Sequence, residues 1–212
     1  MKTTYYQLSE NSFITVIDWP GWDVVWANKD AREPYWIVVE DVTPTDLAER
    51  LKNLNLHPLM MEDCSSPDHS TLVDRYSDAI YIEFPTNADC EYGEVAYLSI
   101  LCLSDLIIAI KRGEVEQLPS FITSLQQDHK LIKGNTANLL YLLIDFFTDK
   151  TITKSLVYRQ QLNRLEKKLV QDPDDIYPNE LTNLKRQLGQ LESICEDQLY
   201  CAKSLILHDN SV

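Results

Sequence analysis

The chain has 212 residues, a length that fits one large domain or one domain with an appendage. With 44% apolar residues, only 5 Gly and only 9 Pro, its composition is that of a folded protein rather than of a loop-rich or disordered chain. The formal net charge of −14 excludes a conventional nucleic-acid-binding protein, disfavours docking on an anionic lipid surface, and is compatible with cation binding.

The first third of the chain alternates predicted strands and short helices. Runs of β-branched and aromatic residues predict strands at 13–19 and 35–40. All four Trp fall before residue 37, and we interpret them as packing the first strands onto a helix. Thr43 and Pro44 predict the start of a helix, because a Thr side chain caps the first turn and Pro fits within it. His57 and Pro58 predict the start of a second, short helix.

The middle of the chain predicts strands at 72–75, 79–84, 95–103 and 106–111, with turn residues between them that suit hairpins. An amphipathic pattern over 115–127 predicts a further helix. Strands and helices mixed in this order predict an α/β (α+β) fold with a mixed β-sheet flanked by helices.

The hydrophobic period changes near residue 135. No Pro or Gly interrupts 135–172, so a helix from about 136 to 171 would run roughly 50 Å. Apolar residues then recur at heptad-like steps on two consecutive helices joined by a two-proline break at 171–178, which predicts a long antiparallel helical hairpin. We expect the seam to consist of Tyr158, Leu162, Leu165, Leu169, Leu181, Leu184, Leu188, Leu191, Cys195 and Leu199.

Charge divides the chain at about the same point. Residues 1–150 hold 11 Lys and Arg against 24 Asp and Glu, whereas residues 151–212 hold 8 against 9. We therefore predict an α/β domain at 1–133 and a protruding helical hairpin at 134–212.

Other sequence signals point to a soluble protein of the reducing cytoplasm. The five cysteines form no C-x-x-C pair, so neither a zinc site nor a disulfide framework is indicated. The N-terminus lacks the apolar region of a secretory signal. No stretch reaches the ~18–20 apolar residues that a membrane-spanning helix needs.

Two motifs connect the chain to a known family. The first reads His-Pro-Leu-x-x-Glu-Asp at 57–63, and the second reads Leu-Leu-Tyr-Leu-Leu-Ile-Asp at 139–145, with Asp149 one turn later. In this order, and about 80 residues apart, they are specific as a pair although each alone is weak. From about residue 34 to 205 the sequence resembles the cytoplasmic domain of CorA-type divalent-cation transporters, which include the ZntB zinc branch.

The sequence departs from the family in two places. After the Glu-Asp pair the family has a short Arg-Pro-Lys element, where this chain reads Ser-Pro-Asp-His at 66–69. The family's stalk helix, membrane helices and Gly-Met-Asn pore loop do not occur in this sequence. The resemblance therefore implies either the soluble part of a longer protein or a soluble paralogue.

The resemblance implies a function in ion transport. The parent would be a homopentamer on the cytoplasmic side of the inner membrane, anchored through a segment that this sequence does not contain. Its ligands would be divalent cations, Mg²⁺ or Co²⁺ or alternatively Zn²⁺, weakly bound between subunits. For this chain alone we expect a monomer or a weak oligomer.

Three carboxylates are the candidate metal ligands. On residue chemistry alone, Glu62 and Asp63 are either a solvated acidic surface or ligands for a hard cation. The family's carboxylates at these positions contribute to regulatory cation sites between subunits. Asp145 lies among apolar residues, where a buried carboxylate would need a partner, and the resemblance makes it the third candidate. We expect the three to line one acidic surface; Asp149 is a weaker candidate.

Neighbouring polar residues have simpler interpretations. Asp68 and His69 could join the same metal shell, but we interpret them as a surface loop. His57 is interpreted as fixing the start of the short helix rather than as a catalytic group.

Two other function classes remain open on the residues. A metal-dependent hydrolase would need clustered His or Asp ligands and a catalytic base. The four His, at 57, 69, 129 and 208, form no ligand pattern, so we predict that the protein is not an enzyme. A soluble oligomerising adaptor, using the leucine-seamed hairpin, is the other alternative.

Overall fold

The computed structural model describes residues 2–8, 13–16, 34–65, 70–76, 79–86, 95–127, 134–171 and 178–207. Within them the strands are β1 (Lys2–Leu8), β2 (Phe13–Val16), β3 (Tyr35–Glu40), β4 (Leu72–Tyr76), β5 (Ala79–Pro85), β6 (Tyr97–Cys102) and β7 (Leu106–Arg112). The helices are α2 (Pro44–Leu51), the 3₁₀ turn η1 (Lys52–Leu54), α3 (Pro58–Ser65), α4 (Leu118–Gln127), α5 (Thr136–Gln171) and α6 (Pro178–Leu207).

One seven-stranded sheet organises the α/β part, in the order β2-β1-β3-β7-β6-β5-β4. The pair β3–β7 is parallel, and the other described pairs are antiparallel. The predicted mixed sheet with flanking helices is confirmed. Sequence analysis missed β1, which pairs with both β2 and β3. Its polar Thr and Gln residues break up the apolar pattern that marked the other strands.

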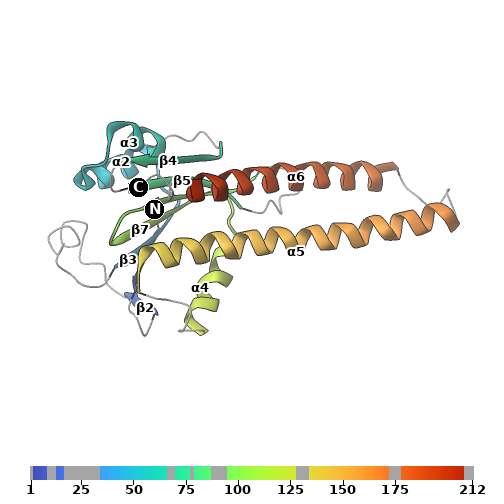
Figure 1. Ribbon diagram of the computed structural model, residues 1–212, viewed down its shortest axis with the longest axis horizontal. Helices are drawn as coiled ribbons and strands as arrows, with labels where there is room; N and C mark the ends of the chain where they lie inside the picture. Colours follow the sequence, from blue (N-terminus) through green and yellow to red (C-terminus); the bar gives the residue numbers. More distant parts are fainter. Residues whose placement is uncertain are drawn as a thin grey trace.

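The sheet separates two hydrophobic cores, because successive residues of a strand point to opposite faces. One face carries Trp36 and Val38 of β3 and packs under α4, α5 and the end of α6. The opposite face carries Ile37 and Val39 and packs under α2 and α3. Figure 1 shows α2 and α3 on one side of the sheet and α4 and α5 on the other.

Trp36 fulfils the predicted role of packing the first strands onto a helix. Its side chain is fully buried, stacks on Tyr6 at 4.9 Å between ring centroids, and meets Phe121 of α4 edge-on at 5.8 Å. The predicted roles of the other three Trp, at positions 19, 22 and 26, lie outside the described residues.

Both short helices begin as predicted. The Thr43 hydroxyl accepts a hydrogen bond from the Asp46 amide at 3.2 Å, and Pro44 stands in the first turn of α2. The His57 carbonyl accepts from the Met61 amide, and its Nδ1 accepts from the Leu59 amide at 3.3 Å. His57 thus caps α3, while Asn55 turns the chain between the helices in a left-handed conformation, at φ 51°.

The helical hairpin is present and protrudes from the sheet (Figure 1). Helix α5 has the predicted bounds. The hairpin base belongs to the core of the sheet domain, since Leu139, Leu143 and Phe147 of α5 and Cys201 of α6 are buried there. Across the described residues, no helix combines the length and the apolar character needed to cross a membrane.

The predicted hairpin seam is partly wrong. Tyr158, Leu184 and Leu191 are buried together with Leu165 and Leu188 beside them. In contrast, five predicted members are exposed: Leu162, Leu169, Leu181, Cys195 and Leu199. The described part of α6 instead buries Ile194, Gln198 and Cys201, which continue the spacing from Leu191 in steps of three and four.

The buried seam of α6 contains a polar residue, Gln198, and the apolar pattern of the sequence therefore did not reveal it. Gln198 is buried because its side-chain amide donates to the Pro85 carbonyl and to the Thr151 hydroxyl, each at 3.0 Å. Towards the tip, a cavity of about 490 Å³ lies between the helices at the level of Leu165 and Leu184. Leu162, Leu169 and Leu181, in the same part of the hairpin, do not line this cavity and are exposed.

Candidate metal centre

Helix α3 presents its two acidic residues at the edge of the sheet domain. Met60 and Cys64, one turn apart, are fully buried against the sheet. This orientation leaves Glu62 exposed and Asp63 partly buried. The carboxylate of Asp63 lies beside Asp74 of β4, which pairs with Tyr81 in the neighbouring strand.

The environment of Asp63 disfavours its negative charge. Partial burial raises the pKa of its carboxyl above the usual range, and the charge of Asp74, a hydrogen bond with that residue and the charge of Glu62 raise it further. The carboxylates of Asp74 and Glu62 therefore both repel that of Asp63 at the end of α3. A proton or a cation bound there would relieve the repulsion.

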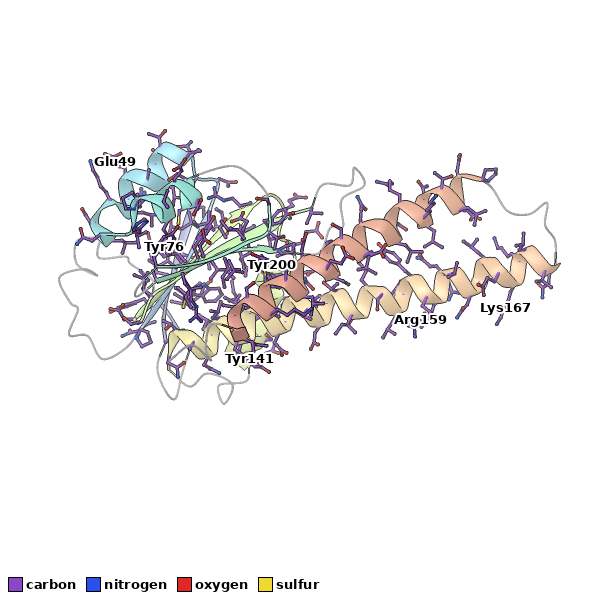
Figure 2. The ribbon with its side chains drawn as sticks, turned by 45° about the horizontal axis from the view of Figure 1, so that its top comes forward. Glu49, Tyr76, Tyr141, Arg159, Lys167 and Tyr200 are labelled. Atoms are coloured by element: carbon purple, nitrogen blue, oxygen red, sulfur yellow. The ribbon has the colours of Figure 1, made fainter. Side chains whose placement is uncertain are left out.

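Asp145 does not meet the other two candidates within one chain. It lies on α5, on the opposite side of the sheet from α3. Figure 2 shows Tyr76 beside α3 and Tyr141, one turn before Asp145, on the other side of the sheet. The expectation that Glu62, Asp63 and Asp145 line one acidic surface is therefore wrong for a single chain.

Asp145 is also exposed rather than buried. The apolar residues around it in sequence turn towards the core, with Leu143 and Phe147 buried, while Asp145 and Asp149 share the outer face of α5. The carboxylate thus needs no buried partner. The apolar sequence neighbours of Asp145 suggested that it is buried. They are no guide here, because a helix brings residues i and i+1 to different faces.

No group of three or more His, Cys, Asp or Glu side chains, searched over the described residues, has the geometry to hold a metal ion. Asp68 and His69 lie outside the described residues. Cys64, next to Asp63, is not an available thiolate, because burial raises the pKa of its thiol to about 12.

Asp74 is the acidic residue that sequence analysis missed. Alternation along β4 could have found it, since Asp74 and Tyr76 share the face that looks towards α3. Tyr76 itself stacks on His57 with 4.5 Å between ring centroids. The start of α3 and its acidic end therefore both face β4.

Each candidate acidic group has an exposed apolar neighbour. Leu59, one turn before Glu62 and Asp63, is 53% exposed. On α5, Tyr141 is 63% exposed one turn before Asp145, and Ile152 and Leu156 continue the same outer stripe. A run of exposed apolar side chains, such as the stripe on α5, is typical of a protein–protein contact surface.

Comparisons with known proteins agree with this fold. The family model described as "CorA-like Mg2+ transporter protein" matches residues 32–212. Among solved structures, full-length CmaX matches at 15% identity with a TM-score of 0.78, covering 98% of this chain and 64% of that one. No curated protein matches the chain.

Two further structures are similar at low identity. The cytoplasmic domain of ZntB from Vibrio parahaemolyticus has a TM-score of 0.72 at 13% identity, covering 98% of this chain and 80% of that chain. The complete CorA magnesium transporter from Methanocaldococcus jannaschii has a TM-score of 0.72 at 14% identity, covering 100% and 64%. The chain thus spans less than two thirds of the length of CmaX and of this CorA protein.

Proposed function

The chain belongs to the family of CorA-like Mg²⁺ transporter proteins, and we propose that it is the domain that senses divalent cations in such a transporter. The family consists of ion transporters rather than enzymes, so the hydrolase alternative is set aside. In the proposal, the cation is bound between neighbouring copies of the chain, by Glu62 and Asp63 of one copy and Asp145 of the next.

The position of the acidic residues on opposite sides of the sheet carries this proposal. A site built from two different faces of the same chain needs a heterologous interface, in which one face of each copy meets the other face of its neighbour. Heterologous contacts close into rings when the rotation per subunit fits a whole number of copies. A homopentamer is one such ring.

The exposed apolar residues support the same interface. Leu59 on the α3 side and Tyr141 on the α5 side would lose water-exposed area when two copies meet. Burial of these side chains favours association, while the carboxylates beside them oppose it. Because apolar burial and carboxylate repulsion oppose each other, a cation that removes the repulsion shifts the interface towards association.

Sensing would work by a shift between two populations. Without a cation, facing carboxylates repel and the subunits separate at the seam; with a cation, the same carboxylates are bridged and the seam closes. Few ligands and retained water molecules give weak binding, which suits an ion present at roughly millimolar concentration.

The donor atoms favour a hard cation. Glu62, Asp63 and Asp145 offer carboxylate oxygens, which suit Mg²⁺, while Zn²⁺ prefers His nitrogen and thiolate sulfur. Cys64, the thiol nearest to Asp63 in sequence, is fully buried and protonated. We therefore propose Mg²⁺, or Co²⁺ in its place, as the sensed ion, with Zn²⁺ as the alternative.

The proposal also implies a place in the cell. A sensor of intracellular Mg²⁺ acts on the cytoplasmic side of the inner membrane, as part of a protein that crosses it. In this arrangement the partners are further copies of the chain and divalent cations, with no nucleic acid.

A Mg²⁺ titration followed by NMR tests the proposal. We expect wild-type shifts at Glu62, Asp63 and Asp145, and smaller or absent shifts in the Glu62→Gln/Asp63→Asn variant. Glu192→Gln is the control, because Glu192 is an exposed carboxylate on α6 that belongs to neither motif. Shifts that map elsewhere, or a double variant that titrates like wild type, would refute the assignment. Self-association that does not depend on Mg²⁺ would favour the alternative function, a soluble oligomerising adaptor.

A further inference from the structure

The C-terminal end of α3 rests on a buried polar cluster that the proposed cation site does not use. Arg112 of β7 and Glu83 of β5 are only 9% and 4% exposed, and both act on the Cys64 thiol, Arg112 lowering its pKa and Glu83 raising it. Buried charges are costly unless they are compensated and hydrogen-bonded. Their position beneath one helix end therefore calls for a structural reason.

Hydrogen bonds tie this cluster to the helix. The Arg112 guanidinium donates through Nη2 to the Cys64 carbonyl and through Nε to the Ser99 hydroxyl at 2.9 Å. The Tyr81 hydroxyl is 2.7 Å from the Glu83 carboxylate and 3.2 Å from the Asp63 carbonyl, so its single proton is shared between them. Sheet side chains thus reach the carbonyls of two successive residues of α3.

These carbonyls are ones that the helix cannot satisfy itself. The last four carbonyls of an α-helix have no partner within it, and a positive charge near them interacts favourably with the helix dipole. Helix α3 has only eight residues, too few to be stable on its own. Arg112 supplies both the donor and the positive charge, and Glu83 is the acidic residue beneath the same helix end.

We propose that Arg112, assisted by Tyr81, is a positioning residue that fixes the C-terminal turn of α3 and thereby sets where the Glu62 and Asp63 carboxylates stand. This inference rests on the proposed cation site. His57 and its stacking on Tyr76 hold the other end of the helix. With both ends fixed, the carboxylates are held in place before the cation binds, and less conformational freedom is lost on binding.

Amide hydrogen exchange and a Mg²⁺ titration, recorded by NMR on the same variants, test the inference. Arg112→Lys keeps the charge and one donor, Arg112→Met removes both, and Tyr81→Phe removes the shared hydroxyl. Arg112→Met leaves Glu83 buried without the Arg112 charge. If the Arg112→Met chain does not fold, Tyr81→Phe serves as the second variant. Arg159→Met, at an exposed position of α5 (Figure 2), is the control.

We expect exchange at residues 62–65 to become at least about tenfold faster in Arg112→Met and Tyr81→Phe, with the central strands still protected. We also expect a severalfold weaker Mg²⁺ affinity, partly restored by Arg112→Lys. Unchanged exchange at 62–65, or faster exchange with unchanged Mg²⁺ affinity, would overturn the inference. A wild-type chain with no Mg²⁺ response at 62–63 would instead refute the cation site, and the exchange rates alone would then decide whether the helix is held.

Discussion

At the scale of single residues, Asp63 links the fold to the proposed sensing. Its carboxyl is held beside Asp74 and Glu62 by the packing of Met60 and Cys64, which fixes the rotation of α3. The folded chain thus maintains a repulsion that an unfolded chain would relax. A cation that relieves it stabilises the arrangement in which it binds.

Replacing Asp63 by Asn should stabilise the chain at neutral pH. The pKa of Asp63 is raised in the folded state, so the folded state binds more protons than the unfolded one between the ordinary Asp pKa and the raised value. The loss of folding stability that the Asp63 charge causes is therefore absent at pH values below the ordinary Asp pKa. It is complete at pH values above the raised pKa. Because the side chain is partly exposed, we expect a gain of at most about 1 kcal/mol, or roughly 2–4 °C in Tm.

Thermal unfolding at pH 7.5 and at pH 3 measures this effect. The difference between Asp63→Asn and wild type should appear at the higher pH and vanish at the lower one. Glu62→Gln, at the exposed neighbour, is the control and should change Tm less. A difference of equal size at both pH values would show that charge repulsion is not its cause.

At the scale of elements, α6 carries the correction to the sequence prediction. The leucine spacing identified both long helices and the residues Leu184, Leu188 and Leu191, but it then followed Cys195 and Leu199 along the wrong side of the helix. A polar seam residue such as Gln198 cannot be recognised without its partners, and these come from β5 and α5. Local patterns predict element type well, whereas partners distant in sequence decide which face is buried.

Adjacent substitutions in α6 test the corrected seam. Ile194 is 2% exposed and Cys195 is exposed. Ile194→Ala should lose about 2–5 kcal/mol of unfolding free energy, because it leaves a cavity where the buried side chain stood. Cys195→Ala should change it by less than about 0.5 kcal/mol. Chemical denaturation measures both, and the reverse order would restore the seam predicted from sequence.

At the scale of the whole molecule, the fold separates the acidic residues that the sequence motifs had joined. The motifs at 57–63 and 139–145 predicted the family and the two helices correctly, because each motif is local. The placement of Asp145 across the sheet depends on strand order and on which face α5 covers. Neither of these follows from the residues between the two motifs. The proposed site, shared by neighbouring copies of the chain, would reconcile the motifs with the fold.

A mixing experiment tests the central claim, that one cation bridges two different faces of neighbouring copies. Glu62→Gln/Asp63→Asn removes the α3 side of the seam, and Asp145→Asn removes the α5 side. Sedimentation velocity at millimolar Mg²⁺ should show wild-type association that neither variant reproduces alone. An equimolar mixture should regain Mg²⁺-dependent dimers, because each variant keeps the face that the other lacks. A mixture that sediments as the sum of its two components would contradict the account.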